Sequence, residues 1–268
     1  MSLAIAQWRL EQRAFWRNRA SSGFQFLLPI VFVIVFGGLF SGNSPVGGIK
    51  YTTYFVAGMV GVSVLGTGFT VQAISLTYQR DLRLLKRLRA TPITPAQLFT
   101  AKILSSATVA AIQVAIILVL GRLAYGVDAP RNWFAFAAAV VFGVLVFCTL
   151  GIAFTVFTPN GDAAVPMVQL PFLVMQFISG LFIPFQHIPK WLQFVADLLP
   201  LRWFMDMVRA AYLGTDYMGL THDDSFGPRP VSGLHALTSQ WPAYAALGAW
   251  GVASLWVALT MFRWENRR

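Results

Sequence analysis

The residue types that most readily support metal binding or nucleophilic chemistry are scarce in this chain. Its three histidines, His187, His222 and His235, are irregularly spaced, and its one cysteine, Cys148, lies within an apolar run. The run His222-Asp223-Asp224 carries metal-ligating groups, but such groups are also ordinary in a solvated loop. A single cysteine cannot form an intrachain disulfide and packs as a small hydrophobic side chain. We therefore expect no metal site.

Motifs that bind or hydrolyse nucleotide are absent from the sequence. The phosphate-binding pattern G-x-x-x-x-G-K-[ST] does not occur, and the nearest approach, Gly47-Gly48-Ile49-Lys50, has neither its spacing nor its hydroxyl residue. The patterns H-E-x-x-H and G-x-S-x-G are missing as well. An intramembrane lipid enzyme would need reactive groups clustered at one depth, and none is found. We expect a chain that is not itself an enzyme and carries no cofactor.

Polar but uncharged side chains lie within the long apolar runs. Such residues most often form hydrogen bonds between helices, and a substrate path of modest polarity is the functional alternative. The middles of the runs contain no Asp, Glu, Lys or Arg, which disfavours a second hypothesis, an ion-gradient-driven transporter or channel. The candidates for a translocation path are Ser63, Thr67, Thr70, Gln72, Gln169, Gln176 and Ser179.

One charged stretch, Tyr78 to Lys102, separates two of the apolar runs. On a helix its leucines fall on one side and most of its basic residues on the other. Asp81 falls in the first turn, and Thr91-Pro92 ends the helix because the residue before proline disfavours the α region. Pro95 permits a new helix to begin at Ala96. Such a segment suits a membrane surface or a docking site for a cytoplasmic partner.

The composition and the long apolar runs are typical of a membrane protein, whose helices would position the residues described above. The 268 residues are 57% hydrophobic and only 11% charged, against about 25% charged in a soluble domain. Six apolar runs are long enough for the roughly 20 residues that a bilayer needs. We predict an all-α integral membrane protein, a single transmembrane domain over residues 1–268, with spans at 24–42, 51–77, 103–121, 133–158, 163–185 and 241–262.

The first 23 residues are predicted to form an interfacial helix. Arginines recur there at every fourth position and share the segment with aromatic residues, a combination that suits a membrane interface. A signal peptide is the alternative, but the following apolar run is long and no A-x-A cleavage site ends it. The interfacial residues are Trp8, Arg9, Arg13, Phe15 and Arg17.

Residues 186–240 form the predicted extracytoplasmic segment. One helix can begin after Pro189 and a second at Pro200, with Gly214 ending the second. Both stretches are rich in aromatic and aliphatic residues, so we expect them at the outer interface or dipping into the membrane. The remainder is polar and loop-like.

The distribution of charge predicts the orientation. The net charge is +10. Of the 20 basic and 10 acidic residues, 13 basic and 4 acidic ones fall on the side that would hold both termini and the stretch 78–102. The positive-inside rule places that side in the cytoplasm. Because the charge follows sidedness rather than one continuous patch, we expect lipid rather than nucleic acid as its partner.

Together these features resemble the membrane subunits of type-2 ABC exporters, including the daunorubicin-resistance-like permeases. The stretch RDLRLLKRLRATPITPAQLFTAK is similar to that family's R-x(n)-L-x-x-L-R-x-T-P-x-x-x-x-x-L-x-x-K run. The stretch FISGLFIPFQHIPKWLQFVADLLPLRWFMDMVRAAYLG is similar to its segment after the fifth span. The chain departs from the family at Leu82-Arg83-Leu84, where the family often has Gly and Glu, and that leaves the subfamily and substrate open.

The resemblance implies a mechanism. Two such subunits, identical or related, would pair and each would bind a separate cytoplasmic ATPase carrying ATP and Mg²⁺. The first, second and fifth spans would line the route, and re-entrant helices would cap it outside. The implied ATPase-coupling residues are Arg80, Asp81, Arg83, Leu84, Leu85, Arg87, Leu88, Thr91 and Pro92. The implied outer re-entrant residues are Gly180, Pro184, Pro189, Trp191, Pro200 and Arg209.

Overall fold

The computed structural model describes residues 3–40, 50–85, 93–183, 185, 188–216, 229–230 and 238–261. Over these residues six helices are long and apolar enough to cross a membrane, which confirms the predicted all-α, six-span architecture. They are α2 (Arg19–Leu39), the continuous α3–η1–α4 (Tyr51–Asp81), α6 (Pro95–Tyr125), α7 (Trp133–Phe154), α8 (Gly161–Ile178) and α12 (Trp241–Met261).

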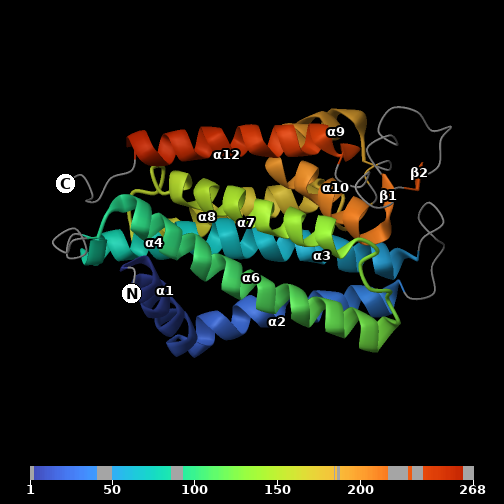
Figure 1. Ribbon diagram of the computed structural model, residues 1–268, viewed down its shortest axis with the longest axis horizontal. Helices are drawn as coiled ribbons and strands as arrows, with labels where there is room; N and C mark the ends of the chain where they lie inside the picture. The colour runs from blue at the N-terminus through green and yellow to red at the C-terminus, as the bar shows by residue number, and fades with distance from the viewer. Residues whose placement is uncertain are drawn as a thin grey trace.

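The six helices run alongside one another between two ends of a bundle (Figure 1). The α1 end carries the helix α1 (Leu3–Arg17), and the β1 end carries the antiparallel pair β1 (Thr215–Asp216) and β2 (Arg229–Pro230). The start of α1 and the end of α12 both lie at the α1 end (Figure 1). An even number of crossings requires this arrangement.

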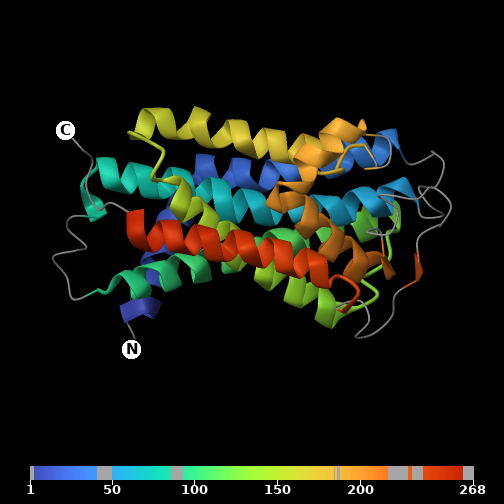
Figure 2. The same ribbon diagram turned by 90° about the horizontal axis from the view of Figure 1, so that it is seen from above.

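The second span is the central rod of the bundle. It is built from α3 (Tyr51–Leu65), a π-helical turn η1 (Gly66–Thr70) and α4 (Val71–Asp81). In two perpendicular views it runs between the other helices (Figures 1 and 2). In its most apolar stretch 89% of the residues are buried, compared with 22% in α2 and 17% in α12. The rod is therefore the element around which the remaining spans pack.

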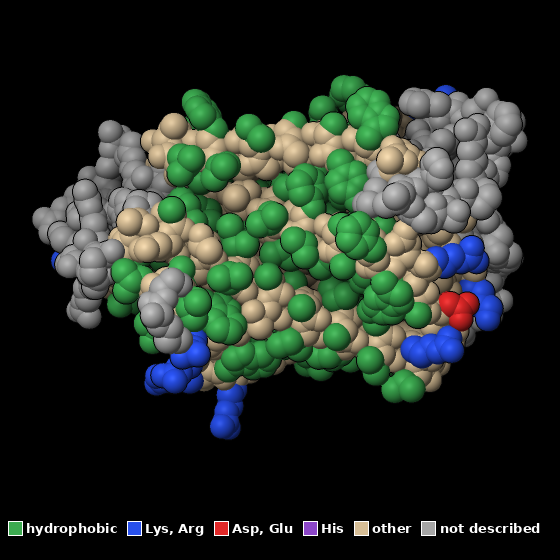
Figure 3. Space-filling view, viewed as in Figure 1, with side chains coloured by type: hydrophobic (Ala, Val, Ile, Leu, Met, Phe, Trp, Pro, Cys, Tyr) green, Lys and Arg blue, Asp and Glu red, His purple; other side chains and the backbone are tan. Residues whose placement is uncertain are grey.

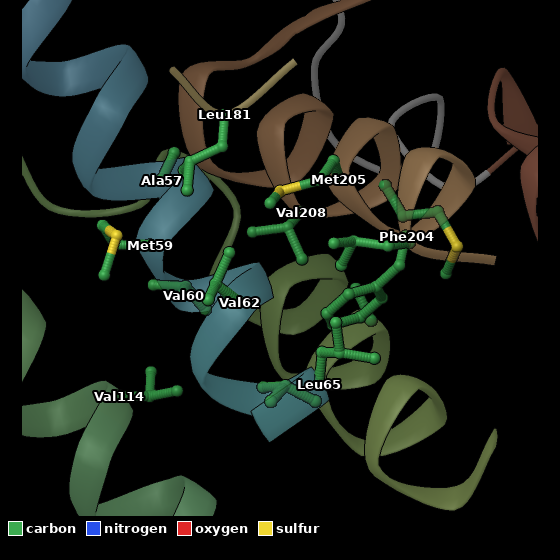
Figure 4. Close-up of a cluster of buried hydrophobic side chains, with 14 of the residues drawn as sticks. Ala57, Met59, Val60, Val62, Leu65, Val114, Leu181, Phe204, Met205 and Val208 are labelled. Atoms are coloured by element: carbon green, nitrogen blue, oxygen red, sulfur yellow. The ribbon is translucent and has the colours of Figure 1, made fainter. Parts of the chain in front are cut away.

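Two further helices were predicted in the segment after the fifth span, and both are present. These are α9 (Lys190–Asp197), which follows Pro189, and α10 (Pro200–Leu213), which Gly214 ends with a φ of 65°. Nearly every residue of α10 is buried, because it lies against α3, α7 and α12. In Figure 4 the side chains Met205 and Val208 point towards α3, and the ring of Phe204 packs against Phe147 of α7.

Glycines allow this packing to be close. A Cβ at Gly143 of α7 would lie 2.2 Å from Cε2 of Phe204, so only glycine admits that ring. A Cβ at Gly151 of α7 would lie 2.6 Å from the carbonyl oxygen of Phe69, in η1. Small residues at such points let the backbones of two membrane helices touch. Helix α7 and η1 are therefore packed backbone against backbone.

The ends of the helices follow local signals in the sequence. The helix α6 begins at Pro95, and Thr94 and Gln97 form a reciprocal capping box before it. The first span begins earlier than predicted, since Asn18 ends α1 and caps α2 through the backbone N–H of Ser21. The helix α8 continues through Pro166 and Pro171.

The surface explains why these helices need a membrane. Figure 3 shows hydrophobic side chains across the middle of one face, with lysine and arginine gathered towards its two ends. Exposed apolar side chains include Leu170 of α8 and Val252, Trp256 and Leu259 of α12, each more than 60% exposed. An apolar surface of this extent is not stable in water. The chain is a multi-pass membrane protein.

Candidate functional site

Arg80 and Asp81 were predicted to face a partner. In the structure both form hydrogen bonds with other segments of this chain at the α1 end. Arg80 is 7% exposed, and its guanidinium donates to the carbonyl oxygens of Thr155, at 2.9 Å, and Thr158. The carboxylate of Asp81 accepts from the backbone N–H of Gly161, the first residue of α8, where the helix dipole favours a negative charge. Asp81 thus ends one helix and caps another, rather than opening a helix of its own.

The turn that follows exposes two leucines. The helix α4 ends at Asp81, and Arg83 adopts a φ of 56°, which an α-helix cannot contain. The prediction that Asp81 lies in the first turn of an amphipathic helix is therefore wrong, because Asp81 is the last residue of α4. Leu82 is 67% exposed and Leu84 is 39% exposed, while Leu85 is fully buried in a cluster of this chain's own residues. Of the other coupling candidates, Arg87, Leu88, Thr91 and Pro92 lie outside the described residues.

A buried ion pair fastens α1 to the start of α6. The ammonium of Lys102 lies 2.7 Å from Oε2 of Glu11 and donates to Oε1 of Gln79, on α4, at 3.1 Å. The side chain of Lys102 is 1% exposed and that of Glu11 is 12% exposed. An unpaired charge so far from water is costly, and partners of this kind offset that cost. The pair links three elements that adjoin the exposed turn.

Hydrogen bonds along α1 extend this attachment. Gln12 donates through Nε2 to the hydroxyl and carbonyl oxygens of Ser105, at 3.0 and 3.1 Å, and Trp8 donates to the hydroxyl of Thr108 at 3.3 Å. Of the other predicted interfacial residues, Phe15 is half-buried, while Arg9, Arg13 and Arg17 are exposed. One side of α1 is therefore bound to α6 and the other carries the basic residues.

Three of the translocation candidates gather around η1. The hydroxyl of Thr67 donates to Oε1 of Gln113, on α6, at 2.9 Å and accepts from Nε2 of Gln25, on α2, at 3.2 Å. Gln72 is 4% exposed and donates to the hydroxyl of Ser106 at 2.7 Å. The third, Thr70, is half-buried. Hydrogen bonds thus join α2, the central rod and α6.

The other translocation candidates are spread along the bundle. Ser63 is buried in α3, one turn before η1, while Gln169 and Gln176 belong to α8 and Ser179 follows it. Ser179 bonds to the carbonyl oxygen of Gln176 at 3.0 Å. Four of the seven candidates therefore lie on the central rod, and the other three lie on α8 or directly after it.

The predicted outer residues Gly180 and Arg209 meet at the β1 end. Arg209 donates through Nη2 to the carbonyl oxygen of Gly180 at 2.7 Å, and its guanidinium carbon lies 3.9 Å above the ring of Tyr54. The hydroxyl of Tyr54 donates to the same carbonyl at 2.8 Å. Gly180 has a φ of 79°, a conformation that favours glycine. Pro189 precedes α9, Trp191 is exposed on it and Pro200 begins α10, while Pro184 lies outside the described residues.

A second arginine of α10, not singled out from the sequence, lies beside this cluster. Arg202 is 4% exposed, pairs with Asp206 and lies 3.6 Å from Asp197. Its guanidinium carbon lies 3.9 Å above the ring of Phe185. Burial lowers the pKa of Arg202 to about 10, and Asp197 opposes the shift. The group therefore remains charged at neutral pH.

Two patterns in the sequence indicate the buried contacts of this region. Lys102 precedes an uncharged stretch from Ile103 to Gly121, so a helix reaching back to Pro95 places it inside the bundle, where it needs an acidic partner. Gln72 and Gln79 are seven residues apart, which places both on one face of α4. The three histidines lie outside the described residues, so the expectation of no metal site is not tested.

Comparison with known proteins matches residues 3–213 to the model of a family described as "ABC-2 type transporter". The match extends from α1 to the end of α10 and therefore includes the exposed turn, the η1 region and the arginine cluster.

Three relatives indicate the range of similar proteins. A "putative transport permease ycf38" of Porphyra purpurea is 30% identical over 78% of this chain and 74% of its own length. The "nodulation protein J" of Neorhizobium galegae is 29% identical over 78% of this chain and 81% of its own length. A "probable multidrug ABC transporter permease YbhR" of Escherichia coli is 24% identical over 62% of this chain and 45% of its own length.

Proposed function

Because this chain belongs to the ABC-2 type transporter family, we propose that it exports an amphipathic molecule across the cytoplasmic membrane with energy from ATP. The family supplies membrane subunits of ABC transporters, which are not enzymes themselves and act with an ATPase. The observation that carries the proposal is the exposed turn Leu82–Leu84 between the second and third spans, since it offers apolar side chains beside Arg83 to a soluble partner.

The ATPase is a separate cytoplasmic subunit that binds ATP and Mg²⁺. The chain itself carries no phosphate-binding loop. The coupling surface comprises Leu82, Arg83 and Leu84, together with the predicted residues Arg87, Leu88, Thr91 and Pro92. A displacement of this surface by the ATPase also displaces Gln79 and Lys102, which flank it in the chain. Because Lys102 is bonded to Glu11, the displacement is transmitted to α1. This connection supports the idea that the ATPase moves α1, α4 and α6 together.

Two membrane subunits, identical or related, pair around the route, with the first, second and fifth spans towards its axis. Alternating access then opens the route to one side of the membrane at a time. The helices α9 and α10 cap it at the outer face, and the contact of Arg209 with Gly180 holds α10 to the end of α8. The name of one relative, a multidrug permease, favours an amphipathic drug, and a lipid or glycolipid has the same chemical character.

A pull-down in mild detergent tests the function. The chain, isolated from its own membranes, is expected to bring down a soluble protein with a phosphate-binding loop in stoichiometric amount. The reconstituted complex is expected to hydrolyse ATP faster when amphipathic substrates are added. A chain that is recovered alone or only with itself, in several detergents, contradicts the proposal and favours ion-gradient flux measurements instead.

The orientation is tested by labelling cysteines from each side of the membrane. In a Cys148→Ser chain, Arg83→Cys is expected to react only from the cytoplasm and Lys190→Cys only from outside. Both positions are exposed in the structure, so a failure to react is not explained by burial. Labelling of the two positions from the same side contradicts the proposed orientation, in which both termini are cytoplasmic.

A further inference from the structure

A cavity of about 570 Å³ lies between α1, α2, the central rod and α6. Its volume falls within the range of roughly 300–1,000 Å³ that is usual for small-molecule sites. Four elements line it, and one of them is the central rod, whose π-helical turn η1 contributes Thr70. Departures from α-helical winding inside a helix are frequent at functional sites.

Two side chains of the lining hold buried oxygen atoms without a partner among the described residues. Gln72 is 4% exposed, and its amide nitrogen is engaged by Ser106, which leaves Oε1 as a buried, unbonded acceptor. The hydroxyl oxygen of Thr70, two residues earlier, is likewise buried and unbonded. An unmade hydrogen bond of this kind costs about 1–3 kcal/mol. Both oxygens are covered in this structure, so a ligand donor recovers this free energy only if the two side chains turn towards the cavity.

Several other polar groups of the lining are already engaged within the chain. Gln25 donates to Thr67, Gln79 accepts from Lys102, and Ser105 accepts from Gln12. The acidic group of the lining, Glu11, is neutralised by its ion pair with Lys102. The site therefore has no unpaired charge for a charged ligand to meet, and its unbonded groups are the Gln72 carbonyl oxygen and the Thr70 hydroxyl, both uncharged.

The rest of the lining is apolar. Phe15 of α1, Ile74 and Tyr78 of α4, and Leu82 of the exposed turn contribute to it. The Tyr78 and Leu82 side chains are 41% and 67% exposed, so this part of the wall continues to the surface at the α1 end. The apolar tail of such a ligand would lie along these side chains, and its head would lie next to Gln72.

We propose that this cavity binds the uncharged head of an amphiphile, a head that carries hydroxyl or amide N–H donors, with its tail along Phe15, Ile74 and Tyr78. The role of the site as a loading position for export rests on the proposed function, but its chemistry does not. The head is held by Gln72 and Thr70, so the site lies on this chain alone and needs no second copy.

Photolabelling of the purified full chain in lipid nanodiscs tests the proposal. Three probes share a decyl chain with a diazirine and differ in the head, which is a glucoside, a trimethylammonium or a sulfate. The glucoside is expected to label peptides of α1, α2 or α4 at least about tenfold more than the charged probes do. Gln72→Leu is expected to lower this labelling about tenfold, since 1.4 kcal/mol corresponds to a factor of ten.

Controls separate binding from folding and from partitioning. Thr260→Val on α12, whose hydroxyl bonds only within its own helix, is expected to label like the parent, whereas Thr70→Val labels less. If Gln72→Leu does not give a monodisperse protein, Thr70→Val carries the test. Equal labelling by all three heads, or labelling that neither variant reduces, overturns the proposal.

Competition tests whether the cavity binds the head as part of an amphiphile or as a free sugar. Unlabelled decyl glucoside is expected to displace the probe, and free glucose at the same concentration is not. Displacement by free glucose overturns the assignment to an amphiphile. Binding of the ATPase is measured on the same preparations, so that its absence would refute the proposed function while leaving the labelling result to decide the site.

Discussion

A chain in which Leu82 and Leu84 are both replaced by glutamate is expected to insert and fold, and to lose its ATPase. The two side chains are 67% and 39% exposed, so a charged group at either position can reach water and the fold is expected to tolerate both substitutions. If the ATPase encloses them, each contributes roughly 1.5–3 kcal/mol to docking. Their joint loss weakens binding at least about 100-fold, because each 1.4 kcal/mol is a factor of ten. Co-purification with the ATPase, quantified against the parent chain, is the measurement.

Two variants serve as controls for this result. Leu198→Glu places the same charge at an exposed leucine between α9 and α10, and it is expected to leave ATPase binding unchanged. Leu85→Glu buries a charge in the chain's own core, so it is expected to reduce the yield of folded protein rather than docking alone. Retention of the ATPase by the Leu82→Glu, Leu84→Glu chain would show that docking does not use this turn.

Replacing Glu11 by leucine is expected to destabilise the chain severely, and replacing Lys102 by methionine at the same time is expected to restore it. The single change leaves a lysine that is 1% exposed without its counter-ion, which costs about 3–5 kcal/mol. The double change removes both charges and returns the stability to within about 1 kcal/mol of the parent. In thermal unfolding of the purified protein, the single variant is expected to lose on the order of 5–10 °C in Tm.

The exposed pair Arg122–Asp128 provides the comparison. Its side chains are 62% and 93% exposed, so Asp128→Asn is expected to change the stability by less than about 1 kcal/mol. If the Glu11→Leu chain unfolds at the same temperature as the parent, the ion pair does not hold α1 to α6. If the double variant is no more stable than the single one, packing rather than charge is responsible.

The sequence predicts the spans well because their signal is local. A run of apolar residues of sufficient length must form a helix in a bilayer, since every backbone N–H and C=O then finds a partner inside the segment. The helices after Pro189 and Pro200 were predicted for a similar reason, because proline begins a helix readily and Gly214 supplies the left-handed end.

The partners of individual side chains were not predicted, because periodicity shows which residues share a face but not what covers that face. Arg80 and Leu85 were both assigned to a partner-facing helix, and both are buried by other segments of this chain. Glu11 and Lys102 are separated by 91 positions, and no local pattern joins them. Thr70 and Gln72 were singled out from the sequence as candidates for a translocation path, whereas the cavity beside them emerges only when α1, α2 and α6 are brought together.

The π-helical turn η1 sets the rotation of α4 relative to α3 within the second span. A π-helix holds about one residue more in a turn than an α-helix does, so α3 and α4 do not share one helical phase. If Gly66–Thr70 were wound as a regular α-helix with no residue removed, α4 would be rotated by about 100° relative to α3. Gln72 and Gln79 would then turn away from α6, while α3 kept its neighbours. The extra residue therefore acts as a phase shift that lets a single rod present one set of side chains to the core and another to the cavity.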